Sequence, residues 1–317
     1  MWRNKRSRNK KFYGEIEKTI GEVANDVPDE KVDEKVVASM KWLETNEAPW
    51  TEVLLHWSTT YDLRKKDLYN NQDKDLSNIF SKWTHYKHPQ GYNLIIQDFS
   101  KMSLSNVALS ESNFKRFFNI ILQNFSINPK DDDGYQMLNK IKEEDLNNDK
   151  KILTMFKLLP HLIPPKTMKK IDGVYKRASL YAAEKCMIRI VKIAGDVTLI
   201  RHEAKQQAQM LKITLQPYII YVDGEDLHEI YVCVDDILYK TNSALEAIDV
   251  CFKAFQVFHV KYPSACEHLW LLIQKGIYMF DTIYDAEIPH IQNVLNKVSL
   301  KLDEKDIDTS DAYELSD

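Results

Sequence analysis

Glycine is scarce in this chain, and that scarcity restricts its possible folds more than any other feature does. Only 8 of the 317 residues are glycine. The α/β folds that bind nucleotides use several glycines in their phosphate-binding turns. The shortage therefore favours a mostly helical protein.

The overall composition is that of a globular protein with a sizeable core. Hydrophobic residues make up 44% of the chain and charged residues 28%, which matches soluble domains. The net charge of −4 gives the whole protein no general attraction for nucleic acid. No apolar run approaches the length of about 18 residues that a membrane helix needs, so we expect no membrane span.

The chain has four cysteines, and none of them is spaced as a C-x-x-C pair. All lie in apolar segments, a pattern typical of buried free thiols. Free thiols indicate a reducing compartment, so we expect an intracellular protein of the nucleus or cytoplasm. The four residues are Cys186, Cys233, Cys251 and Cys266.

Charge and polarity divide the chain into five parts. Residues 1–35 are basic and polar, and residues 303–317 are acidic; neither segment has enough apolar residues to offset the entropy of ordering, so we expect disordered tails. Between them we expect a helical region over 36–128 and a helical region with a small sheet over 151–302. The polar residues 129–150 would form an excursion or a linker.

Apolar residues recur at helical spacing through much of the chain. The segments concerned are 36–45, 50–70, 75–83, 111–125, 151–159 and 178–213. Ser110 or Ser112 would cap the fourth helix, and Pro160 would end the fifth. The segment from Tyr92 to Phe99 is too short to assign.

The pattern changes to strands after residue 213. Two apolar, β-branched stretches, 214–224 and 229–241, predict two or three antiparallel strands with a turn at Asp235-Asp236. Two S-x-x-E sequences, Ser243 to Glu246 and Ser264 to Glu267, each predict the start of a helix. We therefore expect a predominantly α-helical α+β fold, in which a small antiparallel sheet is followed by two capped helices.

No motif for nucleotide binding or for common hydrolases occurs in the sequence. The run Asp131-Asp132-Asp133-Gly134 does not fit a calcium loop, because position twelve would be Lys140. Cys251, His259, Cys266 and His268 match no usual zinc spacing. We expect neither a metal, nor a cofactor, nor an enzyme.

Residues 82–102 concentrate aromatic side chains around the turn Pro89-Gln90-Gly91. Aromatic residues dominate the energetics of protein cores, so the main interpretation is that this stretch locks a turn against the helices. The other interpretation is a partner-binding surface formed by Trp83, Tyr86 and Tyr92.

The N-terminal run RNKRSRNKK is the main basic feature that the sequence shows. Such a run can contact phosphates or be recognised by an import receptor. The candidate contact residues are Arg3, Lys5, Arg6, Arg8, Lys10 and Lys11.

Several short motifs occur in a characteristic order between about residues 50 and 280. They are Trp57-x-x-Thr60-x-x-x-Arg64, Trp83-x-x-Tyr86-Lys87-x-Pro89-x-Gly91-Tyr92-x-Leu94-Ile95-x-x-Asp98-Phe99, Leu158-Leu159-Pro160-x-x-Ile163-Pro164-Pro165, Leu215-Gln216-Pro217, Tyr231-Val232, Ala247-Ile248-Asp249-x-Cys251-Phe252-Lys253-x-Phe255, Tyr262-Pro263 and Trp270-x-x-Ile273-Gln274. In this order the chain resembles uncharacterised animal proteins labelled sterile alpha motif domain-containing protein three-like. The resemblance implies no catalytic residue.

These observations predict a non-enzymatic protein-interaction protein, a scaffold or regulatory adaptor with an unidentified protein partner. The alternative is a nuclear, nucleic-acid-associated factor, derived from a mobile element, that uses the basic N-terminal tail. The sequence leaves the oligomeric state open.

Overall fold

A computed structural model describes residues 33–296 of the chain except for a few short gaps. The gaps are 72–75, 144–145, 167, 172–173, 212–213, 226 and 284. Within the described part, the chain is a mostly helical α+β protein with a small mixed sheet, which confirms the predicted fold class. It forms two units, the first reaching Thr60 and including Thr282–Asp285, the second containing the rest.

The first unit is built on two helices, α2 (Glu34–Thr45) and α3 (Trp50–Thr59). The Asp33 side chain caps α2 by accepting a hydrogen bond from the backbone N–H of Lys35 at 2.9 Å. The two helices meet where Trp42 stacks on His56, with ring centroids 4.4 Å apart. Because α2 starts at Glu34, the described helix begins inside the last residues of the expected N-terminal tail.

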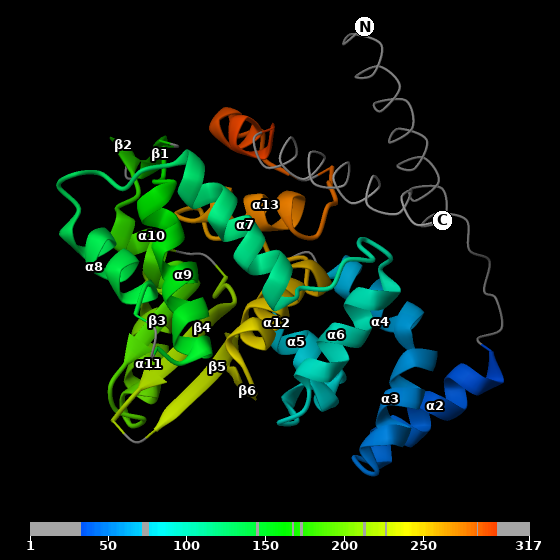
Figure 1. The fold of residues 1–317 in the computed structure, drawn as a ribbon. Helices are drawn as coiled ribbons and strands as arrows, with labels where there is room; N and C mark the ends of the chain where they lie inside the picture. The colour runs from blue at the N-terminus through cyan, green and yellow to red at the C-terminus, as the bar shows by residue number, and fades with distance from the viewer. Residues whose placement is uncertain are drawn as a thin grey trace, which may run out of the picture. The chain divides into compact units, whose positions relative to one another are not determined.

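The second unit contains the remaining helices of the described chain (Figure 1). They are α4 (Tyr61–Asn70), α5 (Leu76–Lys82), the short 3-10 helix η1 (Thr84–Lys87), α6 (Tyr92–Lys101), α7 (Glu111–Asn124), α8 (Asp132–Ile141), α9 (Asn148–Leu162), α10 (Leu180–Met187), α11 (Asp196–Leu211), α12 (Ala244–Val257) and α13 (Glu267–Gly276). Residues 289–296 are also helical.

The strands of the second unit form two separate sheets. The first is a hairpin of β1 (Met168–Ile171) and β2 (Val174–Arg177), and the second has four strands in the order β3-β4-β5-β6. The bounds of those four are β3 (Ile188–Val191), β4 (Tyr218–Asp223), β5 (His228–Val234) and β6 (Ile237–Thr241).

Two or three antiparallel strands were predicted after residue 213, and three are present, as β4, β5 and β6. The β5–β6 turn falls at Asp235-Asp236, as predicted, since Val234 pairs with Ile237 and Asp235 has a φ of 52°. The sheet is nevertheless mixed, because β3 pairs with β4 in parallel. That pairing needs a crossover, which α11 provides.

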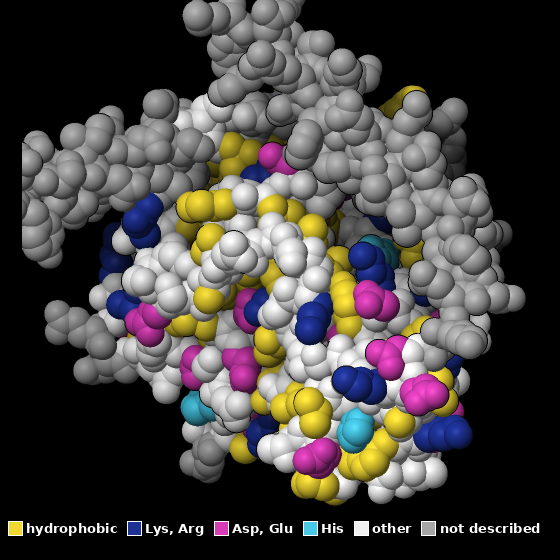
Figure 2. All heavy atoms as spheres, turned by 90° about the vertical axis from the view of Figure 1, so that its right-hand side faces the viewer, with side chains coloured by type: hydrophobic (Ala, Val, Ile, Leu, Met, Phe, Trp, Pro, Cys, Tyr) yellow, Lys and Arg dark blue, Asp and Glu magenta, His cyan; other side chains and the backbone are white. Residues whose placement is uncertain are grey.

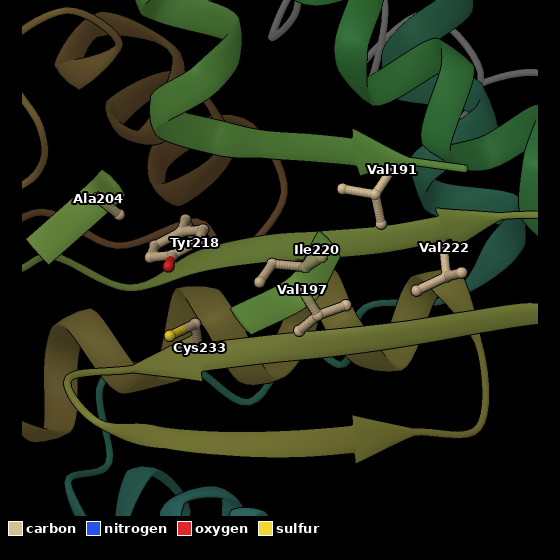
Figure 3. Packing of buried hydrophobic residues seen from close by; sticks show 7 residues of the cluster. All are labelled: Val191, Val197, Ala204, Tyr218, Ile220, Val222 and Cys233. Atoms are coloured by element: carbon tan, nitrogen blue, oxygen red, sulfur yellow. The ribbon is translucent and has the colours of Figure 1, made fainter. Parts of the chain in front are cut away.

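Helices cover both faces of the four-stranded sheet. On one face, Val197 and Ala204 of α11 pack against Val191, Ile220 and Val222 (Figure 3). The alternate residues of β4 point to the other face, where α12 contacts β4, β5 and β6. Every residue of β4 is therefore buried.

The segment 178–213, predicted as long helices, contains β3 between α10 and α11, so that prediction was wrong at Ile188–Val191. This run is apolar, β-branched and short. Periodicity cannot distinguish such a strand from a buried helical turn, and the strand forms because β4 supplies its backbone partners.

Two predicted helix boundaries also need correction, and the unassigned segment from Tyr92 to Phe99 can now be assigned. The helix expected to stop at Pro160 is α9, which reaches Leu162; a proline in the last turn removes one hydrogen bond without ending the helix. The segment from Tyr92 is helical, as α6. Ser264 does not cap the final predicted helix, since α13 starts at Glu267 with Cys266 at the N-cap position.

Other predicted ends are confirmed. Ser110 caps α7 and forms a capping box with Asn113. The Ser243 hydroxyl accepts a hydrogen bond from the backbone N–H of Glu246 at 3.1 Å. The Glu246 carboxylate accepts from the backbone N–H of Asn242, one residue before the expected partner.

Candidate functional site

The aromatic stretch 82–102 lies in the interior of the second unit. The exposed fractions of Trp83, Tyr86 and Tyr92 are 3%, 0% and 9%. Tyr86 packs edge-on against Phe258 at 5.1 Å between ring centroids, and Tyr92 packs similarly against Tyr239 at 6.3 Å. In this conformation the three rings offer little surface to a partner.

A buried ion pair explains why Tyr86 and Asp98 occur in this stretch. Arg64 donates two hydrogen bonds to the Asp98 carboxylate, at 2.6 and 3.1 Å, and Tyr86 donates a third at 2.7 Å. Arg64 and Asp98 are 0% and 1% exposed. Buried charges require such pairing, so these residue types serve the fold. Burial, and then the neighbouring Asp98 charge, raises the pKa of Tyr86 well above its usual value.

Trp83 and Gly91 belong to the same arrangement. The Arg64 guanidinium lies 5.2 Å from the Trp83 ring centroid, a cation–π distance. The Trp83 indole N–H donates to Asp67 at 2.8 Å. Gly91 has a φ of −59°, so it is not needed for a positive φ. It is needed because a Cβ there would lie 2.4 Å from the Tyr86 carbonyl oxygen.

The N-terminal candidate residues fall outside the described part of the chain. These are Arg3, Lys5, Arg6, Arg8, Lys10 and Lys11. Their proposed contact with nucleic acid or an import receptor stays a prediction.

A second buried charge cluster centres on His161 in α9. Its Nδ1 lies 2.6 Å from Asp131 and its Nε2 lies 2.6 Å from Glu184. A carboxylate can only accept, so both ring nitrogens donate and the imidazole is protonated. Burial opposes this charge, but the hydrogen bonds to Glu184 and Asp131 raise the pKa of His161 above its ordinary value.

A third cluster lies at the carboxyl end of β4. Asp223 is 7% exposed and accepts hydrogen bonds from Lys150 at 2.6 Å and Lys192 at 2.7 Å. Burial opposes its ionisation, but these two ammonium groups lower the pKa of Asp223 to about 2. Both oxygens are thus engaged by lysines, which makes this carboxylate a structural ion pair.

The described residues contain no group of three or more His, Cys, Asp and Glu side chains placed to hold a metal ion. Asp131 caps α8 by accepting from the N–H of Gly134 at 3.1 Å. His268 lies 2.8 Å from the carbonyl oxygen of Ile163. The hollow beside α7, lined by Phe117 and Ile277 among others, has a volume of about 160 Å³, below the usual size of ligand pockets.

One continuous segment stands out by its charge, and we call residues 166–193 the basic segment. It contains eight Lys and Arg residues but one Asp and one Glu, so its net charge is +6, which leaves −10 for the rest of the chain. It comprises the hairpin β1–β2, helix α10 and strand β3 (Figure 1). By contrast, the face shown in Figure 2 carries charges of both signs interspersed.

The hairpin places like charges opposite each other. Lys169 pairs with Lys176 in the register of β1 and β2, and Lys170 pairs with Tyr175. Tyr175 is 65% exposed and Met168 is 48% exposed, so apolar surface accompanies the positive charge.

The basic segment continues along α10 and β3. Ser179 caps α10, and Tyr181 in its first turn is 63% exposed, with the Lys185 ammonium 4.4 Å from its ring centroid. In the described sheet β3 is an edge strand, since β4 is its one neighbour. Ile190 in this strand is 40% exposed, and Ile193 just after it is 65% exposed.

A pattern of dense basic runs such as RNKRSRNKK does not identify this segment. The lysines and arginines of residues 166–193 are separated by apolar residues, so no run forms. A charge sum over a window of this length would have identified it. Only the tertiary structure shows that the basic segment consists of one hairpin, one helix and one edge strand.

Comparison with protein-family models, with curated proteins and with solved structures found no match. Among the described residues, no helix is both long enough and apolar enough to cross a bilayer.

Proposed function

We propose that this protein is a scaffold or regulatory adaptor that binds an acidic partner protein through the basic segment. The observation that carries the proposal is the combination of a net charge of +6 over residues 166–193 with exposed Met168, Tyr175 and Tyr181. Protein interfaces join an apolar centre, rich in aromatic residues, to a polar rim. The basic segment supplies both.

Charge complementarity defines the partner. A net +6 on one segment of a chain that is otherwise negative favours a partner surface rich in Asp and Glu. The exposed rings of Tyr175 and Tyr181 favour apolar side chains among those acids.

The test uses charge reversal in the full-length chain. Lys166, Lys176 and Arg177 are exposed, and no described residue forms an ion pair with Lys176 or Arg177. The first variant changes these three residues to Glu. The matched control changes the exposed Lys65, Lys66 and Lys101 to Glu, which alters the net charge equally.

Affinity purification of the tagged protein from its own cells, after nuclease treatment, provides the readout. We expect bound proteins that the control retains and the basic-segment variant loses, and whose binding weakens as salt is raised. Partners retained by both variants would overturn the assignment to the basic segment. Circular dichroism of each variant shows whether the fold is intact.

The hairpin also favours a second candidate function, nucleic-acid binding. A two-stranded ribbon fits the major groove of DNA, and the exposed Tyr175 is followed by the exposed Lys176 and Arg177, with which no described residue forms an ion pair. Fluorescence anisotropy with a labelled duplex and a labelled single strand tests this directly. Binding that falls steeply between about 50 and 200 mM salt, and that the reversal of Lys166, Lys176 and Arg177 abolishes, would favour nucleic acid over an acidic protein.

A further inference from the structure

Ser179 lies within the basic segment, at the junction of strand β2 and helix α10 (Figure 1). The residue is exposed, and its side-chain oxygen accepts a hydrogen bond from the backbone N–H of Ala182 at 3.1 Å. Ser179 is thus the N-cap residue of α10. An exposed serine is a residue to which a protein kinase can transfer a phosphate group.

The residues around Ser179 have the charge pattern that a kinase with an acidic substrate groove selects. Lys176 and Arg177 lie three and two positions before the serine, and the apolar Leu180 follows it. Among all the serines and threonines of the sequence, Ser179 alone has basic residues at both of those positions. Because kinases choose their substrates partly by such charge patterns, Ser179 is distinguished from every other hydroxyl-bearing residue of the chain.

The backbone before Ser179 is extended and accessible, as entry into a kinase groove requires. Val174–Arg177 is strand β2, and Ser179 itself has a φ of −75° and a ψ of 160°. Lys176 and Arg177 are exposed, and in the described hairpin β2 has β1 as its one neighbour. Leu180 is the first helical residue. It lies in a turn whose N–H groups have no partner inside the helix, so this turn can open at low cost.

We propose that Ser179 is a phosphorylation site for a protein kinase that selects basic substrates, and that its phosphate weakens the binding of an acidic partner to the basic segment. The second half of the proposal rests on the function proposed above, whereas the first half stands without it. A phosphate adds about two negative charges at neutral pH, so the net charge of the basic segment would fall from +6 to about +4.

The modification is a displacement at phosphorus. The Ser179 oxygen attacks the γ-phosphorus of ATP bound to the kinase, and the bond from that phosphorus to the bridging oxygen of ADP breaks. The hydroxyl proton passes to the catalytic aspartate of the kinase. The products are phosphoserine and ADP, and no group is oxidised or reduced.

The start of α10 is a favourable place for the added charge. The helix dipole and the N–H groups of the first turn favour a negative group at the N-cap position. Arg177 and the exposed Lys176 add positive charge within three residues of the serine. We therefore expect phosphorylation to change the charge of the basic segment without unfolding α10.

The first experiment incubates folded, full-length protein with ATP, Mg²⁺ and the catalytic subunit of cyclic-AMP-dependent protein kinase, which modifies serines that follow basic residues. Mass spectrometry of the digested protein locates the phosphate, which we expect at Ser179. Lys176→Ala with Arg177→Ala should slow its incorporation about tenfold or more, because two charge pairs with the kinase are lost. The matched control, Lys65→Ala with Lys66→Ala, removes the same charge from exposed positions of α4 and should leave the rate unchanged. A folded protein that gains no phosphate at Ser179, or gains it equally fast in the Lys176 and Arg177 variant, would overturn the site.

The second experiment separates the charge at Ser179 from its role as a cap. Asn and Asp cap helices about as well as Ser does, so Ser179→Asn blocks phosphorylation and keeps the cap, while Ser179→Asp adds one negative charge. In affinity purification, the phosphorylated protein and the Asp variant should retain acidic partners about threefold less than the unmodified protein does. The Asn variant should retain them fully, with or without kinase treatment.

The outcomes distinguish the two halves of the proposal. Equal retention of acidic partners by the Asp and Asn variants would overturn the effect of phosphate on binding. If the unmodified protein retained no salt-sensitive partner, the proposed function would fail together with that second half. The phosphorylation site at Ser179 would then still be decided by the first experiment.

Discussion

Replacing His161 with leucine tests whether buried charge organises the second unit. His161 is 5% exposed, and its ring lies 2.6 Å from Asp131 on one side and 2.6 Å from Glu184 on the other. It therefore joins the start of α8, the end of α9 and the middle of α10. Leucine keeps much of the volume but leaves two carboxylates facing an apolar side chain.

The cost follows from what each carboxylate retains. Breaking a buried ion pair by removing one partner costs about 3–5 kcal/mol. Glu184 keeps the Lys157 ammonium at 3.2 Å, and Asp131 keeps the N–H of Gly134 at 3.1 Å. The free energy of unfolding should therefore decrease by about 3 kcal/mol, the lower end of that range. This corresponds to a roughly 150-fold change in the folding equilibrium constant.

The cost should depend on pH in a defined direction. The folded protein raises the pKa of His161 above its ordinary 6.5, so the contribution of the imidazolium is complete below that value. It is lost as the pH rises through the folded-state pKa. Glu184 has a lowered pKa, so its contribution is present above the ordinary carboxyl range and is lost in acid. The difference between wild type and variant should be largest near pH 5.5–6.5 and should shrink in alkaline solution.

Urea unfolding of wild type and His161→Leu at about pH 5.5, 7 and 9 measures the effect. The control is His202→Leu, because His202 is exposed in α11, where its Nε2 lies 2.8 Å from the Gln206 side-chain nitrogen and near no carboxylate among the described ion pairs. It should cost less than about 0.5 kcal/mol at every pH. A pH-independent cost for His161→Leu, or one below about 1 kcal/mol at pH 5.5, would refute the reasoning.

Three other substitutions probe the remaining features of the fold. Asp98→Asn should destabilise the protein by about 3 kcal/mol in urea unfolding, because Arg64 loses its buried countercharge; a cost near zero would count against a charged pair. Gly91→Ala should lower the stability by about 1–3 kcal/mol, since the new Cβ meets a backbone oxygen at 2.4 Å, whereas Gly195→Ala meets no atom within 4 Å and should be nearly neutral. Ser243→Ala should cost about 1 kcal/mol in thermal unfolding through the lost N-cap; an unchanged melting temperature would contradict the cap.

Secondary structure could be predicted from the sequence wherever a short segment contains its own hydrophobic periodicity or its own helix cap. The shortage of glycine and the apolar stripe after Ser243 predicted a helical protein, and α12 begins where its cap was expected. The Asp235-Asp236 turn was predictable too, since Asp tolerates the φ of 52° found at Asp235. Such features depend on residues within a few positions of each other.

Strand β3, and the arrangement of the basic segment as a hairpin, a helix and an edge strand, could be assigned only from the tertiary structure. Ile188–Val191 is a strand because β4 lies beside it, and no local pattern indicates a parallel partner whose paired residues lie more than thirty positions away.

Residues 82–102 show most clearly what the sequence predicts and what only the tertiary structure decides. Its residue types identified a locked turn, but the reason for its Tyr86 and Asp98 is Arg64, which lies in another helix. Local propensity is set by neighbours along the chain and can be read from one segment. Burial of a charge depends on which distant group meets it, and packing of the whole unit decides that.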